Sequence, residues 1–236
     1  LVSDTWRDAA GRTIKQQGAS SDAFSKTAYD GLGRVTKQYT CYDTDETAYG
    51  DADDVTGDTV LEQSVPSYDA SGNVIQTTSY ARKHTEGGTG ELTTSSARVT
   101  YVASWFDGAS RQTATANYGT NGGSAFSRPS TPPERSDTVL VTSTAYNTAG
   151  LAYQTTDPAG KESRSEFDDA GRTTKQIGDY VDGNPATGSS DEDVTVEMAY
   201  NSDGQVTTLT AKNPTTGDQV TKYVYGSDVG GITPEI

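Results

Sequence analysis

The sequence predicts an all-β protein: an array of antiparallel β-hairpins, with about 15 strands in a coiled or spiral sheet. Three observations lead to this prediction. The chain holds 14 tyrosines and many Thr and Val residues, which suit pleated surfaces. It also holds 25 glycines, which punctuate turns. Finally, a motif of an aromatic residue, Asp or Asn, two further residues and Gly recurs along the chain.

The composition limits the classes of protein. The chain has 236 residues, of which 31% are hydrophobic, and a net charge of -15. Low hydrophobicity and high charge can indicate disorder, but the strand-forming residues favour a thin sheet. With 33 acidic against 18 basic residues, nucleic acid is not an expected partner, because phosphates require clustered Lys and Arg. No apolar run reaches the roughly 18 residues of a membrane span, so no membrane insertion by this segment is expected.

Seven copies of the motif define one set of turns. The Asp or Asn side chain accepts a hydrogen bond from a backbone N–H two residues on, and Gly three positions later takes a left-handed conformation. In the fourth copy Ser110 replaces the glycine. The motif turns lie near 8–11, 30–33, 69–72, 107–110, 147–150, 168–171 and 201–204. The predicted structural turn residues include Tyr29, Asp30, Gly33, Tyr68, Asp69, Gly72, Phe167, Asp168, Gly171, Tyr200, Asn201 and Gly204.

The spacing between motifs shows where the chain varies. Successive motif acids are 22 residues apart from Asp8 to Asp30 and 21 apart from Asn147 to Asp168. Longer spacings carry inserts, each one strand-length beyond its motif turn. The inserts are residues 43–58, 83–92, 118–137 and 178–193, with short equivalents at 157–161 and 213–218. Because alternate turns of an up-and-down antiparallel sheet lie on opposite edges, we expect all the long inserts on one edge.

The strands fall between these two sets of turns. Several alternate, as Val194, Val196 and Met198 do with their neighbours, and no stretch indicates a helix. Representative predicted strands span 34–42, 60–68, 73–81, 97–106, 138–146, 193–200 and 219–225. We expect one continuous repeat array over residues 1–236. Because the pattern is already running at both ends, we also expect this array to be a fragment of a longer protein.

The motif copies resemble YD repeats, the Y-D-x-x-G-[RKN] units of the Rhs, teneurin and insecticidal Tc-toxin families. The resemblance rests on YDGLGRV at 29–35, YDASGNV at 68–74, FDDAGRT at 167–173 and YNSDGQV at 200–206. It extends over nearly the whole chain and is weakest in the inserts. It implies a β-sheet shell, which in Rhs and Tc proteins encloses a C-terminal toxin segment and in teneurins supports cell-surface adhesion. The long acidic inserts make the chain similar to large YD-repeat surface proteins of bacteria.

Few residues suit catalysis. His84 is the only histidine and Cys41 the only cysteine, so a zinc site lacks ligands and a His-based triad lacks a recognisable nucleophile. The self-cleaving aspartate of Rhs proteins is not implied either, because Lys161 stands where that motif would have Leu. We therefore predict no enzyme activity, no catalytic residue and no cofactor. A hydrolase with paired carboxylates is the weakest hypothesis, since the motif acids are explained by turns.

Two binding sites are candidates. The first acidic insert offers the oxygen ligands that Ca²⁺ prefers, at Asp43, Asp45, Asp51, Asp53 and Asp54. A solvated acidic loop is the alternative interpretation. Tyr101 and Trp105 are candidates for stacking on sugars. The alternative interpretation, which the thin sheet favours, is that these aromatic residues pack on the inner face of the shell.

The sequence predicts a non-catalytic segment of a YD-repeat shell that scaffolds or encloses a cargo, such as a toxin domain, in a secreted or cell-surface protein. The alternative is an adhesion or carbohydrate-binding module that uses the long inserts. Expected partners are neighbouring YD repeats of the same or an identical chain, and an enclosed toxin segment or surface glycans.

Overall fold

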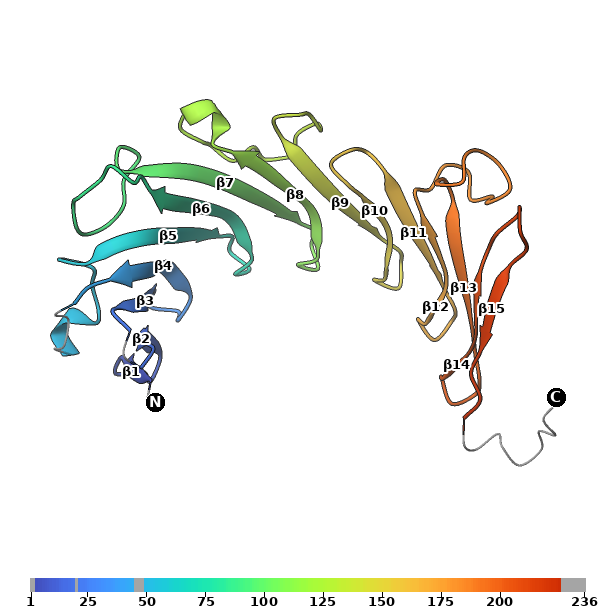
Figure 1. The fold of residues 1–236 in the computed structure, drawn as a ribbon, viewed down its shortest axis with the longest axis horizontal. Helices are drawn as coiled ribbons and strands as arrows, with labels where there is room; N and C mark the ends of the chain where they lie inside the picture. The colour runs from blue at the N-terminus through green and yellow to red at the C-terminus, as the bar shows by residue number, and fades with distance from the viewer. Residues whose placement is uncertain (1–2, 20, 45–48, 226–236) are drawn as a thin grey trace. The chain divides into compact units, whose positions relative to one another are not determined.

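The computed structural model describes residues 3–19, 21–44 and 49–225. Fifteen antiparallel strands form one sheet in which every strand neighbours the next strand of the chain (Figure 1). Apart from two 3-10 turns of three residues each, the described residues hold no helix. The strand order runs from β1 to β15 without closing into a barrel. The predicted fold class is therefore confirmed.

The strands have the following bounds: β1 Asp4–Arg7, β2 Thr13–Gln17, β3 Ala23–Tyr29, β4 Val35–Tyr42, β5 Thr59–Tyr68, β6 Val74–Arg82, β7 Ala97–Phe106, β8 Gln112–Gly119, β9 Leu140–Tyr146, β10 Ala152–Thr156, β11 Glu162–Phe167, β12 Thr173–Gly178, β13 Val194–Tyr200, β14 Val206–Ala211 and β15 Gln219–Lys222. Two predicted strands extend more than one residue beyond the observed ones. The strand predicted at 138–146 begins at Leu140, because Val139 donates its N–H to the Ser136 carbonyl in a preceding turn. The strand predicted at 219–225 ends at Lys222.

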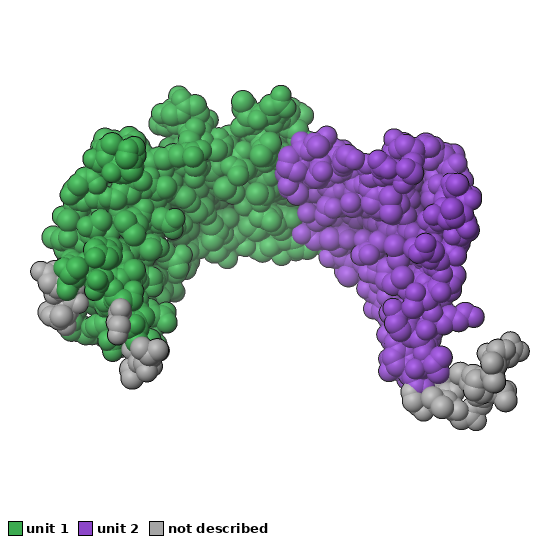
Figure 2. Space-filling view, viewed as in Figure 1, with its two compact units in different colours: residues 1–141 green, residues 142–236 purple. Residues whose placement is uncertain are grey.

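The chain divides into two compact units, residues 1–141 and 142–236 (Figure 2). In each unit the motif turns connect an odd-numbered strand to the following even-numbered strand. The inserts connect an even-numbered strand to the following odd-numbered strand, and therefore lie at the other ends of the strands. We call them insert 1 (43–58), insert 2 (83–96), insert 3 (120–139) and insert 4 (179–193). Within each unit the predicted separation of the two kinds of turn is confirmed.

Each motif hairpin also contains a β-bulge that the sequence analysis did not predict. In the hairpin of β3 and β4, Tyr29 faces Val35 but Ala28 faces Lys37, so one residue of β4 is unmatched. The same shift stands next to the motif aromatic in the hairpins of β5–β6, β7–β8, β11–β12 and β13–β14. Bulges increase the local twist and bend the strand. The motif is therefore a turn combined with a bend.

The apolar residues of unit 1 gather on one face of its sheet, beneath the inserts. Val55 of insert 1 and Leu92 of insert 2 pack with Phe24, Tyr39 and other buried residues of the strands. A second cluster, formed by residues of β7, β8 and β9 such as Trp105 and Val141, packs against Phe126 of insert 3. The sheet alone has no second layer on this face, so the inserts provide one.

Candidate functional site

The motif turns have a common hydrogen-bonding geometry. In the second copy, Asp30 Oδ1 accepts the N–H groups of both Leu32 and Arg34 at 2.9 Å. The backbone closes the same turn, since the Gly33 N–H donates to the Asp30 carbonyl at 3.0 Å. Gly33 has a φ of +81°, which is the left-handed region that suits glycine. All seven copies repeat both carboxylate or amide bonds.

The residue after the glycine has a role that the sequence analysis missed. Arg34 Nε donates to Asp30 Oδ2 at 2.8 Å, so its guanidinium completes the coordination of the carboxylate. The backbone N–H and then the side chain of Arg34 hold the pKa of Asp30 below its ordinary value. Arg12, Arg111 and Arg172 bind the motif acids of their own copies in the same way.

This arginine also connects consecutive copies. The Arg34 guanidinium lies 4.7 Å from the centre of the Tyr68 ring, which belongs to the next motif. The Tyr68 hydroxyl donates to the Val35 carbonyl at 2.8 Å, immediately after Arg34. The same two contacts join Arg12 and Thr13 to Tyr29. They also join Arg172 and Thr173 to Tyr200. We call this pair of contacts the repeat clasp.

Both contacts of the clasp are replaced together where the fifth motif copy meets the sixth. Leu151 replaces the arginine in the fifth copy, and the next motif aromatic is Phe167, which has no hydroxyl. The Leu151 side chain lies beside Gly171 in the place that the Arg12 guanidinium takes beside Gly33, so an apolar side chain occupies the position of the arginine. The motif residues thus close the turns and join consecutive repeats.

Insert 1 is organised around a buried ammonium group. Lys26 of β3 is 3% exposed and its Nζ lies 2.8 Å from Asp58 Oδ2, which is equally buried. The same Nζ donates to the carbonyl oxygens of Asp51 and Asp54, the latter at 2.6 Å. Three oxygens from insert 1 therefore surround one internal cation.

Inserts 2 and 3 each depend on an arginine. Arg82, at the end of β6, donates to the carbonyl oxygens of Glu86 and Gly88 within insert 2, and to that of Val60 in β5. Arg128 of insert 3 donates to the Ser104 carbonyl and lies 4.8 Å from the centre of the Trp105 ring. In both inserts a guanidinium joins the insert to the sheet: Arg82 binds carbonyls of insert 2 and of β5, and Arg128 binds a carbonyl of β7.

In insert 4 the buried charge is a carboxylate, whereas in inserts 1 to 3 the organising group is a cation. The buried carboxylate of Asp193 accepts the N–H groups of Val181 and Gly183, each at 2.9 Å, and that of Asp182 at 3.2 Å. Burial opposes ionisation of Asp193, but these N–H groups prevail and hold its pKa below the ordinary value. Arg164 of β11 lies beneath the Tyr180 ring, 3.5 Å from its centre.

The predicted sugar-stacking residues are not available for that purpose. Trp105 is 5% exposed and Tyr101 is 9% exposed. Insert 3 covers both: Trp105 Nε1 donates to the Pro129 carbonyl at 3.2 Å, and Phe126 stacks on Tyr101 with ring centres 5.1 Å apart. The glycan prediction is thus corrected in favour of its alternative, because both rings belong to the packed layer between sheet and insert.

The calcium candidates do not converge where the structure describes them. Asp45 lies outside the described residues. Among the described residues no three His, Cys, Asp or Glu side chains come together in a way that would hold a metal ion. The carbonyl oxygens of Asp51 and Asp54 face the Lys26 ammonium instead. Calcium binding stays an untested prediction. His84 is exposed in insert 2, and Cys41 is fully buried in the first apolar cluster.

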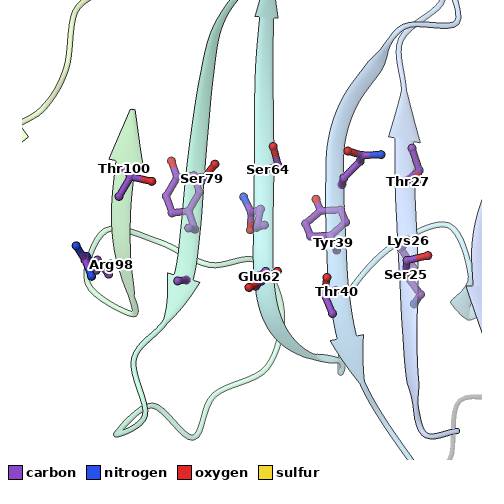
Figure 3. Close-up of a pocket in the computed structure, with 14 residues that line it drawn as sticks. Ser25, Lys26, Thr27, Tyr39, Thr40, Glu62, Ser64, Ser79, Arg98 and Thr100 are labelled. Carbon is purple, nitrogen blue, oxygen red and sulfur yellow. The ribbon is translucent and has the colours of Figure 1, made fainter. Parts of the chain in front are cut away.

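The opposite face of unit 1 carries a broad hollow. It has a volume of about 780 Å³ and extends over β3 to β7 (Figure 3). The strand registers arrange its side chains in two rows across the five strands. One row is Ser25, Thr40, Glu62, Ala81 and Arg98, and the other is Thr27, Gln38, Ser64, Ser79 and Thr100. These two rows supply hydroxyl and amide groups together with one acid and one base. The residues between the rows that also border the hollow are Lys26, Tyr39, Gln63 and Tyr80.

A smaller hollow of about 300 Å³ lies on the insert-covered face, between inserts 1 and 2. Its wall includes an ion pair between Lys37 and Glu91. The Tyr39 hydroxyl donates to Glu91 at 2.9 Å, and burial together with that carboxylate raises the pKa of Tyr39. Lys37, Tyr39 and Glu91 already pair with one another, so the hollow of about 780 Å³ is the better candidate for binding.

In the described part of the chain, no helix has the length and apolar character needed to cross a membrane.

Comparison with known proteins identifies the fold. No protein-family model matches the sequence, and no curated protein does. Among solved structures, the TcdB2-TccC3 crystal structure matches with a TM-score of 0.52 and 15% identity, over 97% of this chain and 11% of that one. The Photorhabdus luminescens Tc holotoxin pore with the TccC3-D651A mutation matches with a TM-score of 0.53 and 14% identity, over 96% and 11%. The chain thus shares its fold with part of Tc toxin components and spans about a tenth of their length.

Proposed function

We propose that this chain is a non-catalytic wall segment of a YD-repeat shell, which encloses a polypeptide cargo within a larger secreted or surface-exposed protein. The observation that carries the proposal is the difference between the two faces of unit 1. One face is sealed by inserts 1 to 3. The other is an uncovered hollow of about 780 Å³ whose side chains are mostly Ser, Thr and Gln.

A wall around a cargo needs these properties. Its outer layer must be stable without the cargo, and the internal ionic contacts of the inserts supply that stability. Its inner surface must tolerate many side chains of the enclosed chain without trapping them. Short hydroxyl-bearing side chains offer water-like hydrogen bonding and little apolar area, so they bind no segment tightly.

The comparisons support the same proposal. The similar structures are components of Tc toxins, and the seven motif copies resemble the YD repeats of that family. From this similarity we infer that the neighbours of this array are further YD repeats, joined by the same repeat clasp. We also infer that the enclosed segment is a toxin or another exported polypeptide.

The proposal is tested by photo-crosslinking in the protein expressed from its own gene. A benzoylphenylalanine replaces Ser79 on the floor of the hollow in one variant, and Glu134 on exposed insert 3 in the control variant. After irradiation, cross-linked peptides are identified by mass spectrometry. We expect the Ser79 position to capture one defined polypeptide segment and the Glu134 position to capture none.

A shell wall would be contradicted if the Ser79 position captured nothing while the Glu134 position captured an external protein. That outcome would favour an adhesion module that uses its inserts. Assays with glycoside, ester and peptide substrates complete the test, and we expect no turnover above that of buffer.

A further inference from the structure

The hollow of unit 1 contains one acid and one base at a defined separation. Glu62 of β5 faces Ala81 of β6, and Ala81 faces Arg98 of β7. Neighbouring strands lie about 4.8 Å apart, so the two charged residues stand roughly 10 Å apart across the sheet. Ala81 between them has a short side chain, and Figure 3 shows Glu62 and Arg98 on either side of that strand. The floor between the two charges is therefore open.

Neither charge is used within the described structure. The chain has ten arginines, all among the described residues. Nine of them contact a hydrogen-bond or ionic partner in the chain. Arg98 is the exception. Glu62 likewise has no partner among the described residues, and both side chains are exposed to the hollow.

Two opposite charges without partners in the described structure suit a ligand that carries both a positive and a negative charge. We propose that Glu62 and Arg98 form a two-point ionic anchor for an extended, mixed-charge polypeptide segment that lies across β5, β6 and β7. A basic side chain of that segment pairs with Glu62, and an acidic side chain pairs with Arg98. This inference rests on the proposed function and specifies what the wall recognises.

Other ligand classes fit the hollow less well. A phosphate-rich polymer requires several cations. Two basic residues border the hollow, Arg98 and Lys26, and the Lys26 ammonium is already bound by Asp58 and the carbonyls of insert 1. A sugar requires an exposed aromatic platform. Tyr39 and Tyr80 border the hollow, but Tyr39 is buried in the first apolar cluster and Tyr80 packs against that cluster. An extended peptide has side chains about 6.6 to 7 Å apart at alternate positions on one face. Flexible Lys, Arg, Asp or Glu side chains can therefore reach both anchors.

The residues beside the anchor help an extended backbone to bind. Ser64, Ser79 and Thr100 stand in the neighbouring row on the same three strands. Their hydroxyls can donate to or accept from peptide groups of any sequence. The anchor thus sets a charge preference while the hydroxyl row leaves the remaining sequence free.

The test uses labelled 12-residue peptides and fluorescence anisotropy at low salt. The probe peptide has a Gly-Ser backbone with Lys and Asp at alternate positions; a Lys-only, an Asp-only and an uncharged peptide serve as comparisons. We expect the mixed peptide to bind most tightly, and Glu62→Gln or Arg98→Gln each to weaken it about three- to fivefold, as for exposed ion pairs. Binding should weaken further with added salt.

Two kinds of variant separate this anchor from general attraction to an acidic protein. The charge-swapped variant Glu62→Arg with Arg98→Glu should retain the affinity for the mixed peptide, because an extended peptide can bind in the reverse direction. Glu134→Gln and Lys222→Gln remove one exposed acid and one exposed base outside the hollow, and should leave the affinity unchanged. Circular dichroism confirms that each variant is folded.

The proposal is overturned if both hollow variants bind the mixed peptide as the unmodified protein does. It is also overturned if the Lys-only peptide binds as tightly as the mixed one. Cross-linking from Ser79 then decides what else fails. Capture of a segment at Ser79 without an effect of Glu62→Gln or Arg98→Gln removes the anchor and leaves the shell wall standing, whereas absence of capture removes the proposed function itself.

Discussion

The two compact units build the same motif hairpins but cover them differently. In unit 1, apolar residues of the inserts, such as Val55, Leu92 and Phe126, pack on the sheet and form two clusters. In unit 2, insert 4 is held by the hydrogen bonds of Asp193 and by the stack of Arg164 on Tyr180. The hairpin array therefore does not dictate the kind of layer that covers it. Local turn chemistry supports either an apolar or a polar cover.

The inserts of both units nevertheless share one device. Each contains or receives a charged side chain that binds the backbone. Lys26, Arg82 and Asp193 each bind several backbone groups, and Arg128 binds one carbonyl group twice. A loop has many backbone groups without strand partners, and a buried ion with fixed hydrogen bonds satisfies several of them at once. The variants below test how much each unit depends on this device.

The largest effect is expected in unit 1. Lys26→Met leaves the buried Asp58 carboxylate without its cation, and the loss of one partner of a buried pair costs about 3–5 kcal/mol of unfolding free energy. Urea denaturation measures this loss. The matched control is Lys212→Met in unit 2. The ion pairs of Lys212 with Glu197 and Asp218 are partly exposed, so solvent screens them and they should contribute little to the unfolding free energy. Equal losses in the two variants would contradict the role assigned to Lys26.

A double variant sharpens this test. Adding Asp58→Asn to Lys26→Met removes the unpaired charge, so part of the lost stability should return. If the double variant is no more stable than the single one, the ammonium acts through its bonds to the Asp51 and Asp54 carbonyls rather than through its charge.

The second effect concerns unit 2. Asp193→Ala leaves three N–H groups of insert 4 without their acceptor, and we expect a loss of about 2–3 kcal/mol, at the scale of unsatisfied buried groups. Asp193→Asn keeps an acceptor oxygen and should lose less. Hydrogen exchange of Val181, Asp182 and Gly183 measures the loss locally. Unchanged protection of these amides in Asp193→Ala would remove Asp193 as the organiser of insert 4.

The pH dependence follows from the same group. The pKa of Asp193 is lower in the folded protein than the ordinary value of 3.8. Its contribution is therefore fully present above pH 3.8 and is lost as the pH falls through the lower folded-state pKa. The difference in stability between the unmodified protein and Asp193→Ala should narrow as the pH is lowered below 3.8. A difference that stayed constant down to pH 2 would mean that the carboxylate charge contributes nothing.

A third prediction compares equivalent turns of the two units. Gly33 and Gly171 have φ values of +81° and +78°, and a Cβ at either position would meet only ordinary contacts. Gly33→Val and Gly171→Val should thus each cost about 1–3 kcal/mol through backbone strain alone. Asn tolerates this conformation better, so Gly33→Asn and Gly171→Asn are the matched controls. A large difference between the two valine variants would show that the turns are not equivalent.

The smallest expected effect is a gain in stability. Ser110 occupies the glycine position of the fourth motif with a φ of +60°. Ser110→Gly should relieve that strain and stabilise unit 1 by about 1 kcal/mol, measured as a rise in the urea midpoint. The Ser110 hydroxyl also accepts a hydrogen bond from Asn73. A net loss of stability would mean that this bond between motifs outweighs the strain.

The sequence by itself determined the hairpin array, because its turns depend on residues that are close in the chain. Asp30, Gly33 and the residues between them contain the groups that close the turn, so the pattern predicts the turn wherever it occurs. The number of strands and the separation of motif turns from inserts followed from the spacing of those patterns. The bulge beside each motif aromatic was missed because strand pairing, rather than local sequence, defines it.

Only the tertiary structure decided which face of the sheet the inserts cover and what they leave open. Trp105 and Tyr101 suggested an exposed platform in the sequence, yet insert 3 buries both rings. The sequence did not point to Glu62 and Arg98, because only the pairing of three strands places them on either side of Ala81. The physical reason is the range of the interactions. A turn is closed within about five residues, whereas burial and the juxtaposition of charges depend on segments brought together by folding.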